Sequence, residues 1–252
     1  MDLETKRSVR LTNHIASDGQ PSWSPDGARV LFVSDRDRDS YSGRAHYQIY
    51  VMARDGSDIR RVRESASADF MPRWSPDGRW IAFLSDGGDA IGLYVMPSAG
   101  GDARSLLPQE FDGDAGNPTW SPESDRVAFD APTGDGYDIY SVDLGGSDVV
   151  NHTRSVETEW YPVWSPDGTE ILFGLLTDSA PNGAHQLVAI NLATGAHRPV
   201  TSPTPLDRTP RDWWPDWSPD GSRVVFSARR EGLWRLFVGP ADGTGGRPLA
   251  DR

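Results

Sequence analysis

Residues Pro21–Gly27 read Pro-Ser-Trp-Ser-Pro-Asp-Gly, and the string continues through a Val/Ile-x-Phe segment to Phe32. The same string occurs five times in the chain. Its tryptophans serve as anchors and stand at Trp23, Trp74, Trp120, Trp164 and Trp217. The anchors lie 51, 46, 44 and 53 residues apart, a period typical of a small sheet unit and not of a helical pair. The chain is therefore a repeat protein whose function should be sought where the repeats differ.

Each repeat can be divided into four short strands. The Pro-x-Trp segment is extended, Ser-Pro-Asp-Gly forms a turn, and the apolar residues after it, such as 30–32, are typical of a strand. A third apolar segment follows, for example 49–52, and a Gly/Asp-rich turn leads to a weaker fourth strand near 59–62. Four strands per repeat predict an all-β fold, a β-propeller of four-stranded antiparallel blades. Only the third copy departs from the turn sequence, with Glu123-Ser124 in place of Asp-Gly.

The string and the strands around it resemble the TolB-type, WD-repeat-like β-propeller family over nearly the whole chain. The resemblance implies one propeller domain over residues 1–252. Its blades are expected near 18–64, 69–109, 114–154, 159–202 and 212–252. The same blade occurs in the TolB subunit of the Tol–Pal system, in propeller domains of prolyl-oligopeptidase-like peptidases, in tricorn-type proteases and in some polysaccharide lyases. The resemblance thus implies a scaffold and not a reaction.

The number of strands leaves ring closure open. Residues 8–13 match the fourth strand of a preceding blade, although 247–249 already supply that strand to the fifth blade. In a closed five-blade ring, residues 8–13 would be an extra closing strand on the outside of blade five. The alternative is an incomplete six-bladed propeller, six being the number in TolB. We expect five closed blades, because five complete units are present and an open sheet edge invites aggregation.

Composition excludes several classes of protein. The net charge is −12 and no Lys/Arg-rich run occurs, which argues against a nucleic-acid partner. No apolar run is long enough to span a bilayer, and the N-terminus lacks the features of a signal peptide. A soluble, acidic chain without a leader is expected. The family resemblance implies a periplasmic or extracytoplasmic location if a leader was trimmed, and a cytoplasmic one otherwise.

The candidate site lies on the side of the ring that carries the long connections 35–46, 177–185 and 202–213, since binding residues usually lie on variable loops of a rigid scaffold. Near the motif proline, each repeat has a carboxylate at this side: Asp18, Asp69, Asp114, Glu159 and Asp212. Two interpretations remain. The carboxylates accept hydrogen bonds from backbone N–H groups of the adjacent blade, or they form a negative funnel for a cation, an amine or a basic peptide.

The residues that follow these acids differ between repeats. Three repeats have bulky side chains there, whereas the first and third have Gly19-Gln20 and Gly116-Asn117. The channel mouth should therefore be walled on one side and roomy on the other. The aromatic groups either plug the channel or form a platform for a ring, a sugar or a partner's side chain. The predicted ligand-binding residues are Asp18, Asp69, Phe70, Met71, Asp114, Asn117, Glu159, Trp160, Tyr161, Asp212, Trp213 and Trp214.

Two functions from different classes follow. The first is a non-catalytic binding module that recognises a protein, a peptide or a small ligand at this mouth. The second is an enzyme of hydrolase or lyase type, in which Asp69, Glu159 and Asp212 do acid–base work on a small molecule or a glycan. Binding is preferred, because no Gly-x-Ser-x-Gly elbow and no other catalytic arrangement can be recognised. No cofactor or metal is assigned: Asp35-x-Asp37-x-Asp39 alternates like a calcium loop but lacks its glycine.

Overall fold

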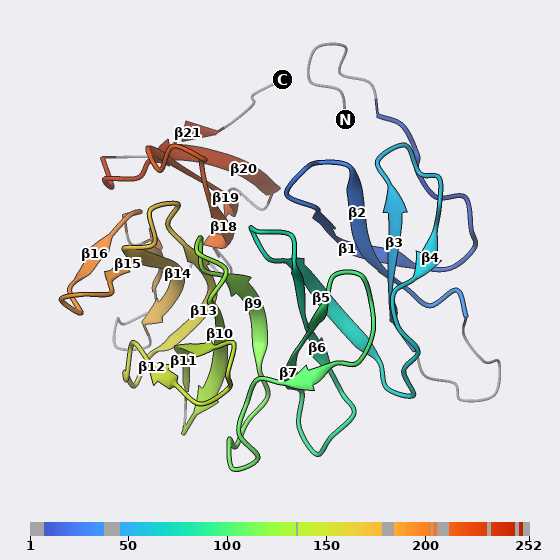
Figure 1. Ribbon diagram of the computed structural model, residues 1–252. Helices are drawn as coiled ribbons and strands as arrows, with labels where there is room; N and C mark the ends of the chain where they lie inside the picture. Colours follow the sequence, from blue (N-terminus) through green and yellow to red (C-terminus); the bar gives the residue numbers. More distant parts are fainter. Residues whose placement is uncertain are drawn as a thin grey trace.

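A computed structural model describes residues 8–37, 46–134, 136–177, 184–202, 204–205, 212–230, 233–244 and 247–248. These residues form β-strands and no helix, so none of them belongs to a helix that could cross a membrane. Figure 1 shows the sheets arranged around a central axis, with the chain passing from one sheet to the next in sequence order. The prediction of an all-β propeller fold is confirmed.

The described strands fall into five blades. Blade one contains β1 (Asp18–Trp23), β2 (Arg29–Ser34), β3 (Gln48–Ala53) and β4 (Arg60–Arg61). Blade two contains β5 (Asp69–Trp74), β6 (Trp80–Ser85), β7 (Gly92–Pro97) and β8 (Arg104–Ser105). Blade three contains β9 (Gly116–Trp120), β10 (Arg126–Thr133), β11 (Gly136–Asp143) and β12 (Val149–Asn151). Blade four contains β13 (Thr158–Trp164), β14 (Glu170–Thr177), β15 (Ala184–Asn191) and β16 (His197–Pro199), and β17 (Thr204–Pro205) pairs with β15. Blade five contains β18 (Asp212–Trp217), β19 (Arg223–Arg230), β20 (Leu233–Pro240) and β21 (Arg247–Pro248).

Within each blade, the strands are antiparallel and hydrogen-bond in chain order from the inside outward. The first strand of every blade lies nearest the central axis (Figure 1). A parallel bridge between Tyr137 and Thr158 joins blades three and four. Elsewhere, isolated backbone bonds join neighbours, such as the one from the Asp69 N–H to the Tyr47 carbonyl at 2.8 Å. Side chains therefore make most of the contacts in each seam, the interface between two neighbouring blades.

The repeated turn is stabilised by its own serine and aspartate. In the first copy, the Ser24 hydroxyl donates to Asp26 at 2.6 Å and accepts from the backbone N–H of Arg29 at 2.9 Å. The turn glycine has a left-handed φ of 65°, which glycine adopts without a steric penalty. The local sequence thus forms the β1–β2 hairpin without help from distant residues.

The third copy, which lacks this glycine, gains a hydrogen bond between blades. Ser124 stands at the glycine position with a φ of 62°. Its hydroxyl accepts a hydrogen bond from the backbone N–H of Asp77 in blade two at 3.0 Å. The substitution therefore adds a polar contact across the seam, which a glycine has no side chain to make.

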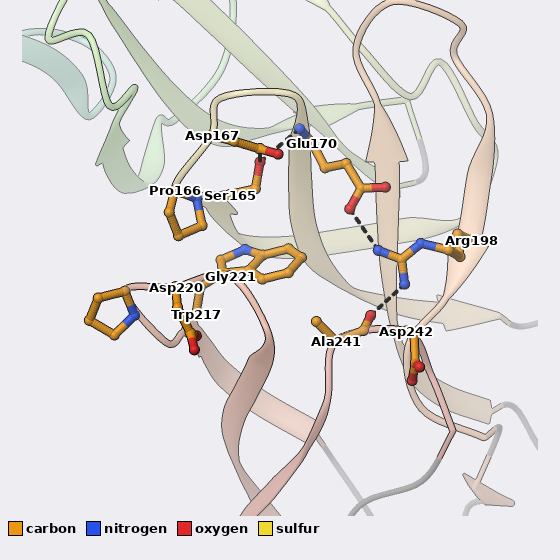
Figure 2. Close-up of a pocket in the computed structure, with 11 residues that line it drawn as sticks. Ser165, Pro166, Asp167, Glu170, Arg198, Trp217, Asp220, Gly221, Ala241 and Asp242 are labelled. Carbon is orange, nitrogen blue, oxygen red and sulfur yellow. Dashed lines mark hydrogen bonds and ion pairs between the residues drawn. The ribbon is translucent and has the colours of Figure 1, made fainter.

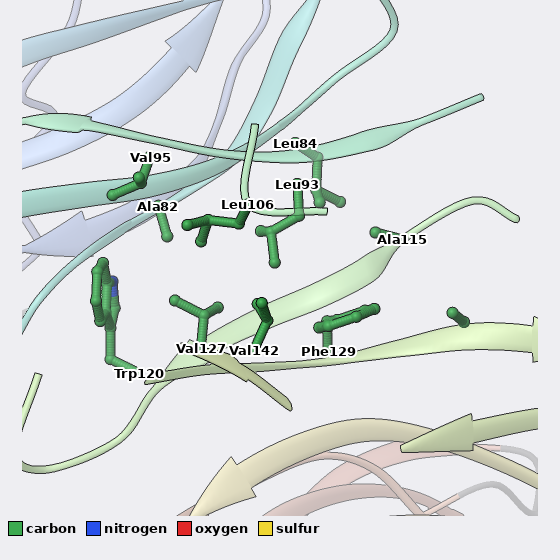
Figure 3. Close-up of a cluster of buried hydrophobic side chains, with 11 residues drawn as sticks. Ala82, Leu84, Leu93, Val95, Leu106, Ala115, Trp120, Val127, Phe129 and Val142 are labelled. Atoms are coloured by element: carbon green, nitrogen blue, oxygen red, sulfur yellow. The ribbon is translucent and has the colours of Figure 1, made fainter. Parts of the chain in front are cut away.

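Hydrophobic clusters fill the seams between blades. Figure 3 shows one of them, in which Leu93 and Val95 of blade two face Val127 and Phe129 of blade three. All four side chains are fully buried. The motif tryptophan also contributes to this seam, because the indole of Trp120 donates to a blade-two backbone carbonyl at 3.0 Å. Apolar contact between successive blades, more than sheet pairing, therefore stabilises the ring.

Blades one and five do not meet as the other blades do. The innermost strands are in contact from β1 through β5, β9 and β13 to β18, whereas no comparable contact joins β18 to β1 among the described residues. Trp23 of blade one is 58% exposed, although Trp120 is only 6% exposed. The expected closed ring of five blades is therefore wrong, and the open arc fits the alternative of an incomplete six-bladed propeller.

The predicted closing strand is also wrong. Residues 8–14 form no strand, and Leu11 packs against the cluster of Val30, Phe32 and Tyr50 in blade one. The segment thus lies on blade one and not outside blade five. In the described part of the chain, no third strand lies beside it to form a ladder, which explains why it is not a strand.

Candidate binding site in the channel

The first strand of every blade is bulged at the same position. The residue before the motif proline has a left-handed φ between 46° and 58° in all five repeats: Gln20, Met71, Asn117, Tyr161 and Trp214. The pairing register of this strand with its neighbour shifts at the same point. Left-handed φ values are uncommon for residues other than glycine, and a bulge of this kind re-aims side chains. The repeated kink therefore shapes the channel wall in all five blades.

A cavity of about 360 Å³ opens in the channel beside these bulges. Its volume lies within the range of small-molecule sites. The first strands of blades two to five supply its lining residues: Arg73, Asn117, Pro118, Thr119, Tyr161, Pro162, Val163, Trp214, Pro215 and Asp216. The rings of Tyr161 and Trp214 meet edge to face, with centroids 5.8 Å apart. The wall thus combines an aromatic corner with several polar groups.

Two opposite charges face this cavity. Arg73 makes no ion pair with any side chain in the described part of the chain. The surrounding protein lowers the pKa of its guanidinium by desolvation, and the negative charge of Asp216 partly offsets this effect. Desolvation likewise raises the pKa of Asp216, against a hydrogen bond from the Trp217 backbone N–H and the charge of Arg73. Both residues are exposed to solvent in the channel.

Neither Arg73 nor Asp216 is among the residues predicted from the sequence. They are the x of Pro-x-Trp, a position occupied by Ser22, Thr119 and Val163 in the other repeats. This position is the variable member of an otherwise constant string, and side chains alternate along a strand. Variation inside the repeated motif, and not only before it, is the signal that points to both residues.

The five predicted carboxylates do not form an open ring. Asp69 is completely buried, and the guanidinium of Arg63 donates to its two oxygens at 2.8 and 3.0 Å. Glu159 is 2% exposed and accepts hydrogen bonds from the hydroxyls of Thr153 and Ser155 at 2.9 and 2.6 Å. In both cases the partner comes from the end of the preceding blade. The funnel prediction is therefore wrong for these two acids, which stabilise seams.

The other described acids also hold local structure. Asp18 accepts from the guanidinium of Arg36 at 3.0 Å, and Asp114 accepts from the backbone N–H of Ile91 in blade two at 2.6 Å. The latter contact matches the predicted bond to an adjacent blade. The side chain of the fifth acid, Asp212, lies outside the described residues, as does that of Trp213.

Glu159 is nevertheless an unusual carboxylate. Burial raises its pKa to about 7, hydrogen bonds from Ser155 and Thr153 oppose the shift, and the neighbouring carboxylate of Asp138 adds to it. Asp138 itself is 2% exposed. The pair lies in the seam between blades three and four. A carboxyl group that is this buried has no access to a substrate in the channel.

The aromatic predictions divide into two groups. Asn117, Tyr161 and Trp214 line the cavity, and their role in binding a ligand stays a prediction. Phe70 and Met71 instead pack against the hydrophobic clusters of blades one to three. Trp160 stacks with His185, with ring centroids 6.3 Å apart, and lies near Tyr137. In blades three to five, the residues with left-handed φ thus form the cavity wall.

The predicted roomy side of the mouth is filled at blade three. A Cβ atom at Gly116 would lie 2.1 Å from an oxygen of Asp130. Asp130 accepts hydrogen bonds from the Asn117 amide at 2.7 Å and from the backbone N–H of Tyr161 at 2.9 Å. Its burial raises its pKa to about 6, an effect that these two bonds oppose. The glycine therefore makes room for a buried carboxylate of the protein and not for a ligand.

A larger cavity, of about 560 Å³, lies between blades four and five beside the repeated turns (Figure 2). Its carboxylates have partners of their own. Glu170 pairs with Arg198 at 2.6 Å, and Asp167 and Asp220 accept hydrogen bonds within their own turns. This cavity is a widened seam whose polar groups are satisfied, so the channel remains the candidate site.

The described residues contain no group of three or more His, Asp or Glu side chains placed to bind a metal. Of the calcium-like string, Asp35 accepts from the backbone N–H of Ser17 at 2.8 Å and Asp37 accepts from the hydroxyl of Tyr50. Asp39 lies outside the described residues, as do large parts of the three long connections.

No protein-family profile matches the chain. It is 31% identical over 221 residues to an uncharacterized peptidase, YuxL, of Bacillus subtilis (strain 168), a match that covers 85% of this chain and 30% of that protein. It is 34% identical over 105 residues to the Tol-Pal system protein TolB of Anaeromyxobacter dehalogenans (strain 2CP-C), a match that covers 42% of this chain and 21% of that protein. The chain thus spans less than a third of either relative.

Among solved structures, a putative TolB from Agrobacterium tumefaciens matches with a TM-score of 0.77 at 21% identity, over 98% of this chain and 86% of that one. The fold is that of a TolB-type β-propeller. An oligogalacturonate lyase in complex with manganese matches this propeller with a TM-score of 0.59 at 15% identity, over 96% of this chain and 80% of that one. A putative TolB and a lyase thus share this scaffold. The fold alone does not indicate the function, which must be inferred from the site.

Proposed function

We propose that this propeller is a non-catalytic binding module whose channel cavity takes the end of a peptide or a small ligand that carries a carboxylate and an amine. The observation that carries the proposal is the pair Arg73 and Asp216, two opposite charges that face one cavity and do not neutralise each other in an ion pair. A guanidinium binds a carboxylate through two parallel hydrogen bonds. The carboxylate of Asp216 is a matching acceptor for an ammonium group.

The aromatic corner supports the same function. Tyr161 and Trp214 stand beside the charged groups, and Trp214 is 61% exposed. An exposed indole next to polar groups is suited to contact with an apolar side chain of a ligand. Because Asp69 and Glu159 are buried in the seams, the ligand is expected to be zwitterionic and not simply basic.

The test is calorimetric titration with tetrapeptides that have either a free or an amidated C-terminus. Arg73→Gln should weaken binding of the free acids at least tenfold and leave the amides unaffected, since a hydrogen bond to a charged group contributes about 1.5–3 kcal/mol. Arg79→Gln is the matched control, because this arginine is 77% exposed in the turn that follows the same strand. Equal affinity of acids and amides for the wild-type protein would refute the role of Arg73.

A catalytic role is the second candidate. Glu159 has a raised pKa, but it is buried and hydrogen-bonded away from the cavity, as is Asp69. Asp216 lines the cavity and also has a raised pKa, so acid–base chemistry in the channel would use it. Hydrolysis or elimination that depends on Asp216 in a substrate screen would replace the binding proposal.

A further inference from the structure

Asn117 lines the channel cavity with a side chain whose two ends differ in their contacts. Its amide nitrogen donates to a carboxylate oxygen of Asp130 at 2.7 Å. In the described part of the chain, no group donates to its side-chain oxygen, and that oxygen is not enclosed by protein atoms. Asn117 therefore offers an open hydrogen-bond acceptor to a ligand in the cavity.

Asp130 determines which end of the Asn117 amide is open. A charged carboxylate only accepts hydrogen bonds, so the NH2 group must be the end that turns toward it. Asp130 is 2% exposed, and the backbone N–H of Tyr161 in blade four donates to the same oxygen at 2.9 Å. Burial raises its pKa to about 6, against these two hydrogen bonds, which leaves the group charged at about pH 8. A fixed negative charge thus orients the amide.

Blade one shows what Asp130 replaces. There the side-chain oxygen of Gln20, the equivalent left-handed residue, accepts from the backbone N–H of Met71 in blade two at 2.7 Å. The corresponding N–H of blade four, that of Tyr161, is bound by Asp130 instead, so the Asn117 oxygen has no such structural task. Among the five repeats, the residue after the motif phenylalanine is acidic only in the third, and the others have Val33, Leu84, Gly174 and Ser227.

We propose that Asn117 is a specificity-determining residue of the channel site and that Asp130 is its positioning residue. This inference rests on the binding function proposed above. The Asn117 oxygen accepts the last amide N–H of a peptide whose C-terminal carboxylate is bound by Arg73. Arg73 and Asn117 lie on the first strands of adjacent blades and line one cavity, and in a peptide a single Cα atom separates the terminal carboxylate from that N–H. The site therefore selects peptides whose last residue has an amide N–H.

The test is calorimetric titration, at about pH 8, with two tetrapeptides that have a free C-terminus and differ only in N-methylation of the last peptide bond. The wild-type protein should bind the methylated peptide about tenfold more weakly, because the Asn117 oxygen then lacks a donor. Asn117→Ala should bring the ratio of the two affinities close to one, and Asp130→Ser should do the same. The preference for free acids over amides, which belongs to Arg73, should remain in both variants.

Asp138→Ser is the matched control. Asp138 is equally buried, at 2%, in the same blade and accepts from the amide of Asn151 at 2.6 Å, but it does not line the cavity. This variant should keep the wild-type ratio. A ratio that persists in Asn117→Ala would overturn the inference and leave the binding function standing, provided that acids still bind better than amides. Failure of both acids and amides to bind would overturn the two together.

The orientation of Asn117 can also be measured without a ligand. In NMR spectra, the side-chain amide protons of Asn117 are assigned by their loss in Asn117→Ala. The proton donated to Asp130 should resonate downfield of those of exposed asparagine side chains, because its acceptor is charged, and Asp130→Ser should remove this shift. An unshifted proton in the wild-type protein would overturn the role of Asp130, whatever the stability of the variants.

Discussion

Arg73 and Asp216 occupy the same position of the second and fifth repeats and line one cavity, yet they form no ion pair with each other. Both side chains are exposed to the solvent in the channel. Among the described residues, neither has a charged side chain as an ion-pair partner. A ligand with both charges would satisfy the two groups at once.

The two charges should select different ends of a ligand. Asp216→Asn should weaken binding of peptides with a free amine at least tenfold and leave N-acetylated peptides unchanged, because only the former place an ammonium near the carboxylate. Calorimetric titration measures both. Glu123→Gln is the charge-matched control, since Glu123 is an exposed acid in a turn. Equal losses for free and acetylated peptides would indicate a structural role for Asp216.

Glu159 should make stability depend on pH. Its folded pKa of about 7 exceeds its ordinary value of 4.5, so between these values the folded state binds more protons than the unfolded state. The free energy of unfolding therefore falls as the pH rises from about 5 to 8, by roughly 1.4 kcal/mol for each tenfold difference in proton affinity between the two states. Urea unfolding at both pH values measures this. Glu159→Gln should reduce the pH dependence, and an unchanged slope would contradict the assignment.

Asp69 should be among the most sensitive acids to substitution. Asp69→Asn leaves the guanidinium of Arg63 without its buried counter-ion, which costs about 3–5 kcal/mol. Asp148→Asn breaks the pair with Arg126, in which the aspartate is 61% exposed, and should cost less than about 1 kcal/mol. Denaturant midpoints of the two variants compare the pairs directly, and similar losses would show that burial is not the deciding factor.

Ser124 allows the backbone strain of the turn to be separated from its hydrogen bond. Both Ser124→Gly and Ser124→Ala remove the bond to the backbone N–H of Asp77, but only glycine relieves the left-handed φ. The alanine variant should therefore be less stable than the glycine variant by about 1 kcal/mol. Thermal unfolding resolves a difference of this size, and equal stability would show that the residue carries no strain.

The repeated string determined the blades, because everything it specifies is local. Ser24, Asp26 and Gly27 form their turn within a few residues, and the apolar residues after it form the buried strand β2. Asn117, Tyr161 and Trp214, which the same local signals indicated, line the cavity. A property that depends on neighbouring residues in the chain can be predicted from the chain.

Only the tertiary structure decided which distant residues meet. Asp69 and Glu159 look like open acids until Arg63 and Ser155 from the preceding blades are seen to bury them. Arg73 and Asp216 are far apart in the chain and share a cavity because the ring brings their strands together. Ring closure likewise depends on the summed angles between blades and not on any one repeat. The physical reason is common to all three: burial and charge pairing are set by contacts between blades, and no local pattern encodes them.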